Sequence, residues 1–130
     1  MQILIPTSAG ELLDKISILT IKKDKIKNPE KLKEINKESL ELQKIAKKTL
    51  PKYSYDIWIN QLIEINEKLW EIEDRIRIKE SNNQFDSEFI GLARQVYIYN
   101  DKRFIVKNEI NANTDSDIKE QKEYVEYNKI

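Results

Sequence analysis

Apolar residues recur at alternating spacings of three and four along four long stretches of the chain, the pattern of helices that face a common core. The first stretch, about Ala9 to Lys27, carries Leu12 and Ile16 on this face. It begins at Ser8 and Glu11, which have the spacing of a capping box. This pattern predicts a first helix that is buried along its apolar face.

The next two stretches are bounded by capping residues and by proline. Asn28 reads as an N-cap, and the proline after it suits the first helical position, so the second helix runs from about Pro29 to Lys48. The third helix, about Tyr55 to Glu80, is the longest, and Ser54 is its expected cap. The short link after the first helix predicts that the first two helices form a tight hairpin.

The fourth stretch can be interpreted in two ways. The segment "QVYIYNDKRFIV" could form a β-hairpin that turns at Asn100 and Asp101. A helix from about Glu88 to Ala112 is favoured, because its apolar residues keep a helical period over more turns than strands usually span. Asp86 or Ser87 is its expected cap.

The two ends of the chain carry shorter patterns. Thr114 and Asp117 have the spacing of a helix start and predict a short last helix, about Asp115 to Tyr127. Residues 2–5, "QILI", are β-prone but precede Pro6 and lack a nearby partner strand. They are expected to form an extended arm that lies on the helices or pairs with another chain.

The fold class follows from these elements and from composition. The chain has 39% hydrophobic and 35% charged residues, with only two Gly and three Pro, which favours long charged helices over turn-rich β structure. A length of 130 residues fits one domain. The sequence therefore predicts a single all-α domain over residues 1–130: an antiparallel bundle of four main helices, with the short C-terminal helix and the extended N-terminal arm.

Charge and residue usage narrow the functional classes. Lys plus Arg and Asp plus Glu number 23 each, so no net field draws the protein to nucleic acid or to an anionic membrane. The absence of Cys and His removes thiol nucleophiles, zinc sites built on those ligands and the usual general base near neutral pH. No signal peptide or membrane span is recognisable, so a cytoplasmic protein without a cofactor is expected.

Several polar residues occupy positions that should be half-buried. On the third helix, Asn66, Glu73 and Arg77 share a stripe with Trp70 at helical spacing. On the fourth helix, two such lines flank the core face. One line contains Arg94, Tyr97 and Asp101, and its neighbour contains Asn100, Arg103 and Lys107. Charged residues are seldom buried unless they are paired, so the stripes indicate either a network of ion pairs between helices or a pocket for a charged ligand.

The ligand interpretation gives a candidate site. Arginine guanidinium groups suit carboxylate or phosphate, and tyrosine and asparagine can add hydrogen bonds. The first expected function is therefore a non-enzymatic binding or accessory module with an Arg- and Tyr-lined centre for a small anion or a partner protein. Its expected ligand-binding residues are Lys15, Glu73, Arg77, Arg94, Tyr97, Asn100, Asp101 and Arg103.

Two alternatives remain, and whether the protein is an enzyme stays open. Glu64 with Glu67, and Glu71 with Asp74, stand three residues apart, a helical spacing that can hold Mg²⁺ in all-α nucleotide pyrophosphohydrolases, although those enzymes take the two pairs from different helices. A metal-dependent hydrolase of this type would use Glu67, Glu71 and Asp74. Alternatively the charged residues only specify packing, in a structural protein that can associate with copies of itself.

Three blocks together resemble a family of small bacterial and phage proteins described as a domain of unknown function. They are "PTSAGELLDKISIL", "LWEIEDRIRIKE" and "FIGLARQVYIYNDKRFIVKNEIN", and the resemblance spans most of the chain. The resemblance implies no activity or ligand. It does imply a set of signature residues, which largely coincide with the polar residues at half-buried positions described above. The signature residues are Glu11, Asp14, Lys15, Trp70, Glu73, Asp74, Arg77, Arg94, Tyr97, Asn100, Asp101, Arg103 and Lys107.

Overall fold

The computed structural model describes residues 1–52 and 54–127, and this part of the chain is all-helical with no strand. Its helices are α1 (Ala9–Lys25), α2 (Pro29–Thr49), α3 (Asp56–Ser81) and α4 (Ser87–Asn113). The all-α prediction is confirmed, and the segment with the hairpin alternative is a continuous helix.

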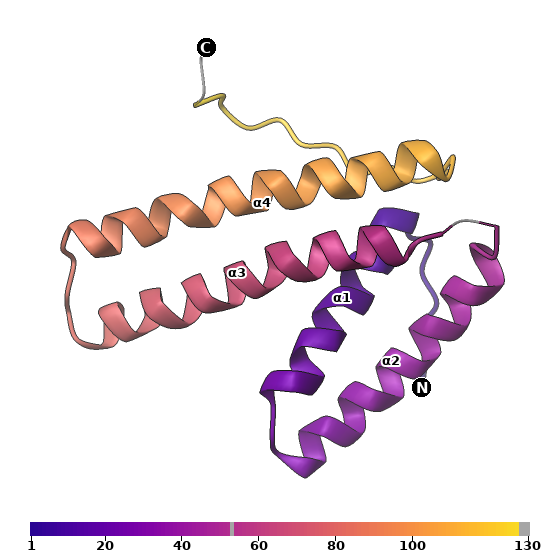
Figure 1. The fold of residues 1–130 in the computed structure, drawn as a ribbon, viewed down its shortest axis with the longest axis horizontal. Coiled ribbons are helices and arrows are strands. Elements are labelled where there is room, and N and C mark those ends of the chain that lie inside the picture. Colours follow the sequence, from indigo (N-terminus) through magenta and orange to yellow (C-terminus); the bar gives the residue numbers. More distant parts are fainter. Residues whose placement is uncertain (53, 128–130) are drawn as a thin grey trace.

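The helices form two hairpins that cross. Figure 1 shows α3 and α4 side by side along the molecule, and the α1–α2 hairpin running obliquely to them at one end. The backbone of α1 lies close to α2, α3 and α4, whereas the backbone of α2 closely approaches α1 alone among the helices of the described chain. The predicted bundle of four helices is therefore confirmed, but its antiparallel arrangement is not supported, because the α1–α2 hairpin runs obliquely to α3 and α4.

Most helix starts are fixed by the expected caps. The side chains of Ser8, Asn28 and Asp86 each accept a hydrogen bond from the backbone N–H three residues later, at 3.0, 3.1 and 3.0 Å. The exception is α3, where Tyr55 is the N-cap and makes no side-chain capping bond. The prediction of Ser54 as a cap is wrong, because α3 begins one residue later than that role requires.

The ends of α3 and α4 share one geometry, which explains why no fifth helix forms. Asn83 and Asp115 have φ of 52° and 53°, the left-handed conformation that short polar residues tolerate. The N–H of the next residue then bonds back into the last turn, as Ser116 does to the Asn111 carbonyl at 3.0 Å. The predicted helix from Asp115 to Tyr127 is therefore wrong: the chain reverses at Asp115, and residues 117–127 return along α4 without helical structure (Figure 1).

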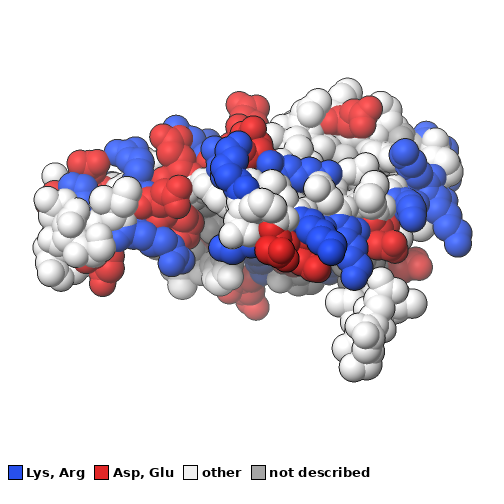
Figure 2. Space-filling model, turned by 90° about the horizontal axis from the view of Figure 1, so that it is seen from below, with Lys and Arg blue, Asp and Glu red and all other residues white. Residues whose placement is uncertain are grey.

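The surface mixes charges of both signs. Figure 2 shows basic and acidic side chains intermixed over the lower face of the molecule. Residues 1–7 are exposed, with Ile3 at 75% and Leu4 at 82% exposure, so the N-terminal arm does not lie buried on the helices. No helix in the described residues has the length and apolarity needed to cross a bilayer.

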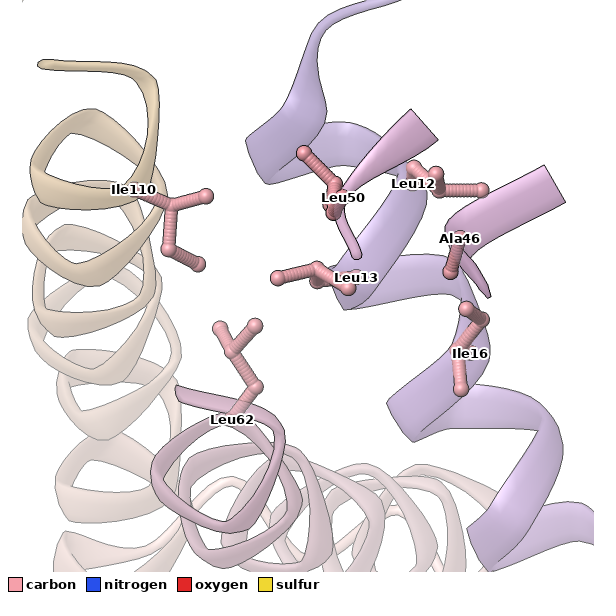
Figure 3. Packing of buried hydrophobic residues seen from close by; sticks show 7 residues of the cluster. All are labelled: Leu12, Leu13, Ile16, Ala46, Leu50, Leu62 and Ile110. Atoms are coloured by element: carbon pink, nitrogen blue, oxygen red, sulfur yellow. The ribbon is translucent and has the colours of Figure 1, made fainter. Parts of the chain in front are cut away.

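The core lies where the two hairpins meet. Figure 3 shows Leu13 of α1 pointing toward Leu62 of α3 and Ile110 of α4, and all three are fully buried. Leu12 and Ile16 pack with residues at the end of α2 in the same cluster. Each such side chain contributes about 1.5–3 kcal/mol before the entropy of ordering is subtracted. This core fixes the face of α1 that meets α3 and α4.

Candidate functional site

A buried ion pair joins α1 to α4. Asp14 lies fully buried within α1, next to the core residue Leu13. The Nε atom of Arg103 donates to both carboxylate oxygens of Asp14 at 3.0 Å, and Nη2 donates to Oδ2. Such two-point pairing fixes both groups, and it offsets the cost of taking the carboxylate out of water.

The third helix completes the shell around this carboxylate. The Asn66 side-chain amide donates from Nδ2 to Asp14 Oδ1 and to Ser17 Oγ, both at 2.9 Å. The Ser17 hydroxyl in turn donates to the Asp14 carbonyl at 2.6 Å. The polar groups are therefore hydrogen-bonded across α1, α3 and α4, as buried polar groups must be if they are not to destabilise the fold.

Lys107 is a second buried cation one helical turn beyond Arg103. It is 5% exposed, and its Nζ lies 2.8 Å from Glu11 Oε2 and 3.2 Å from Glu120 Oε1. Burial alone would lower the pKa of Lys107, but the hydrogen bond to Glu11 and the neighbouring carboxylates outweigh it and raise that pKa. The buried ion-pair network predicted from the sequence is therefore present, centred on the Asp14 and Lys107 pairs.

A close backbone contact brings the acidic start of α1 to these cations. The Gly10 N–H donates to Asn111 Oδ1 at 2.7 Å. A Cβ atom on Gly10 would lie 2.6 Å from the Lys107 carbonyl oxygen, closer than real Cβ contacts come. Only glycine permits this approach, and the approach places Glu11 and Asp14 beside the two cations.

An open cleft of about 440 Å³ lies beside the ion pair. Its apolar lining includes Trp70, and its polar lining includes Glu73, Asp74, Asn100 and Arg103. The volume is in the usual range for small-ligand sites. The cleft is therefore lined by an aromatic ring together with carboxylate, amide and guanidinium groups.

The charge of the cleft is negative. The Arg103 guanidinium is matched by Asp14 directly behind it. Glu73 pairs at 3.3 Å with Arg77, whose side chain is 78% exposed, so this pair is weak. Asp74 makes no ion pair within the described residues. The carboxylates therefore exceed the cations that face this space.

The structure brings together only part of the predicted site. Glu73, Asn100 and Arg103 meet in the cleft, whereas Tyr97 and Asp101 line a different pocket that shares Asn100 with it. The other three predicted residues lie elsewhere on the surface: Lys15, Arg77 and Arg94 are exposed. The ammonium of Lys15 pairs with Glu38 of α2 at 3.0 Å.

The carboxylates proposed for a metal do not form a ligand set. Glu67 and Glu71 are exposed on α3, and Glu71 lies 3.9 Å from the ammonium of Lys68. Within residues 1–52 and 54–127, no group of three or more carboxylates is close enough together to hold a metal ion. The three residues Glu67, Glu71 and Asp74 therefore do not form such a group in the described chain.

Some central residues were absent from the predicted ligand-binding set. Asp14, Trp70 and Lys107 belong to the signature that the family resemblance implied, and Asn66 lies on the shoulder that periodicity identified. Glu120 was missed completely. It was placed in an expected helix, and only the chain reversal at the end of α4 brings it to Lys107.

Comparison with known proteins identifies a family without assigning an activity. The model of the family described as "Family of unknown function (DUF6165)" matches residues 1–128. No curated protein and no solved structure matches the chain. The chain belongs to DUF6165, a family of unknown function.

Proposed function

We propose that the protein is a non-enzymatic binding module whose cleft between α1, α3 and α4 takes a small amine-bearing molecule. The observation that carries the proposal is the combination of Trp70 with Glu73 and Asp74 in one cleft. An aromatic face attracts cations through its quadrupole, and the two carboxylates, of which Glu73 makes only a weak exposed pair, add a direct charge interaction.

The ion pair behind the cleft supports this choice. The Nε and Nη2 groups of Arg103 donate hydrogen bonds to Asp14, whereas its Nη1 group has no hydrogen-bond partner within the described residues. It can donate to an oxygen of the ligand. Because Asp14 neutralises the guanidinium, this contact orients a ligand without requiring that the ligand be an anion.

The anionic ligand expected from the sequence has less support. That expectation depended on three arginines, and two of them, Arg77 and Arg94, are exposed outside the cleft lining. The residues that do line the cleft include carboxylates, amides and one arginine, with no hydroxyl or amine nucleophile beside a base. This composition favours binding over covalent catalysis.

The test is thermal unfolding of the wild type and of Trp70→Leu in a panel of amines, polyols, nucleotides and dicarboxylates. A ligand at a hundredfold excess over its dissociation constant raises the free energy of unfolding by about 2.7 kcal/mol. We expect amines to stabilise the wild type and to lose that effect in Trp70→Leu. Stabilisation by dicarboxylates alone would instead favour the anion site, and stabilisation by no compound would contradict a small-ligand function.

A further inference from the structure

A second pocket lies between α4 and the returning C-terminal segment, residues 117–127. Its volume is about 550 Å³, and its lining includes Tyr97 and Asp101 from α4 with Tyr124 and Tyr127 from the segment. It shares Asn100 with the cleft described above. The pocket therefore combines three phenol rings with one carboxylate, on a different part of α4.

Two of these rings form walls at nearly a right angle. The ring centroids of Tyr97 and Tyr127 are 4.9 Å apart, and the ring planes are inclined at 78°. The Tyr127 hydroxyl donates to Asp101 Oδ2 at 2.7 Å, which fixes that ring against α4. The other oxygen, Asp101 Oδ1, has no hydrogen-bond partner within the described residues. One carboxylate oxygen thus stays available in a corner made of aromatic rings.

The same region already holds an ammonium group against aromatic rings. The Nζ atom of Lys122 lies 5.4 Å from the ring centroid of Phe104 and 5.7 Å from that of Tyr124. These distances are within the range over which the ring quadrupole attracts a cation. Lys122 also lines the pocket, so it would compete with a second cation.

The segment that supplies two of the rings is held through side chains. Residues 117–127 make no backbone–backbone hydrogen bond within the described chain, and their side-chain contacts with α4 include those of Glu120, Lys122 and Tyr127. Segments held in this way open locally at low free-energy cost. A ligand can therefore enter from the side of the segment and gain contacts when it closes.

We propose that this pocket binds an organic ammonium group, with Tyr97 and Tyr127 as its walls and Asp101 as its counter-ion. A methylated ammonium suits the site best, because its diffuse charge and apolar surface fit aromatic rings while a single carboxylate oxygen satisfies its charge. The inference does not depend on the function proposed for the cleft, because the two sites use different aromatic and acidic residues.

The test is a titration of the full chain with choline, in which binding is measured from the changes of chemical shift in NMR spectra. Dimethylbutanol, the uncharged carbon analogue of choline, is the ligand control. We expect choline to bind, and the analogue to bind about tenfold more weakly because it lacks the charge. Binding of both compounds with equal affinity, or of neither, would overturn the proposal.

Variants then assign the site. Tyr97→Leu and Asp101→Asn should each weaken choline binding about tenfold, while Lys122→Met should strengthen it by removing the competing ammonium. Tyr99→Leu is the matched control, since Tyr99 lies on α4 but does not line the pocket. Loss of choline binding in Trp70→Leu but not in Tyr97→Leu would assign the ammonium to the cleft, which would refute this site and support the first proposal.

Discussion

The guanidinium of Arg103 on α4 donates two-point hydrogen bonds to the carboxylate of Asp14, which is fully buried on α1. This contact joins the two crossed hairpins, and Arg103 also lines the cleft. In the proposed function, this pair of side chains would therefore serve both the stability of the fold and the binding of a ligand.

Removing the guanidinium should be severely destabilising. Arg103→Met leaves the Asp14 carboxylate buried without its counter-ion, and we expect the free energy of unfolding to fall by about 3–5 kcal/mol. The measurement is urea denaturation at neutral pH. Arg77→Met is the control, because that arginine makes only an exposed pair with Glu73 and should cost at most about 1 kcal/mol. Equal losses in the two variants would show that the buried pair has no special role.

The two glycines of the chain should respond in opposite directions to alanine. In Gly10→Ala the new Cβ would meet the Lys107 carbonyl at 2.6 Å and separate α1 from α4, which should cost about 1–3 kcal/mol. In Gly91→Ala the Cβ meets no atom within 4 Å, and higher helix propensity should add about 0.5–1 kcal/mol. Denaturation curves of both variants test this, and a neutral or stabilising Gly10→Ala would contradict the close packing of α1 on α4.

The ion pairs at the α3–α4 turn should make stability depend on acid pH. Hydrogen bonds from Lys79 and from the Phe89 N–H lower the pKa of Asp86. A carboxylate whose pKa is lower in the folded state stabilises the fold above its unfolded pKa, near 4, and that stabilisation is lost as the pH falls through the folded value. Asp86→Asn keeps a capping oxygen but removes the charge. We expect the Asp86→Asn variant to unfold more easily than the wild type at neutral pH, and to be equally stable once the wild-type carboxylate is protonated. Denaturation curves at neutral and acid pH measure this. A difference in stability that persists in acid would mean that the charge of Asp86 is not its cause.

The helices were predictable because local signals agreed with their packing. The caps Ser8, Asn28 and Asp86 and the apolar periods place α1, α2 and α4 closely, since each helix buries one face. The prediction of a C-terminal helix failed at Asp115. The capping pattern at Thr114 is typical of a helix start, but Asp115 adopts the left-handed conformation that ends α4. When few apolar side chains follow, periodicity cannot show whether such a position starts a new helix or only ends the previous one.

The site was predictable only in part, for a geometric reason. Helical spacing identifies the residues that flank a buried face, and in this way Glu73, Asn100 and Arg103 were found. It does not show which flank meets a neighbouring helix, because that depends on the crossing of the hairpins. Arg77 and Arg94 therefore satisfied the spacing but are exposed outside the cleft lining.

The most direct test of the central claim compares two ligands of similar length and opposite charge. Titration calorimetry with putrescine and with succinate asks whether the cleft selects a cation. We expect putrescine to bind the wild type, and to bind far more weakly when Glu73→Gln and Asp74→Asn are combined. Glu64→Gln, on an exposed part of α3 outside the cleft, should leave binding unchanged. Binding of succinate instead of putrescine, or putrescine binding that survives in the double variant, would contradict an amine site formed by Trp70, Glu73 and Asp74.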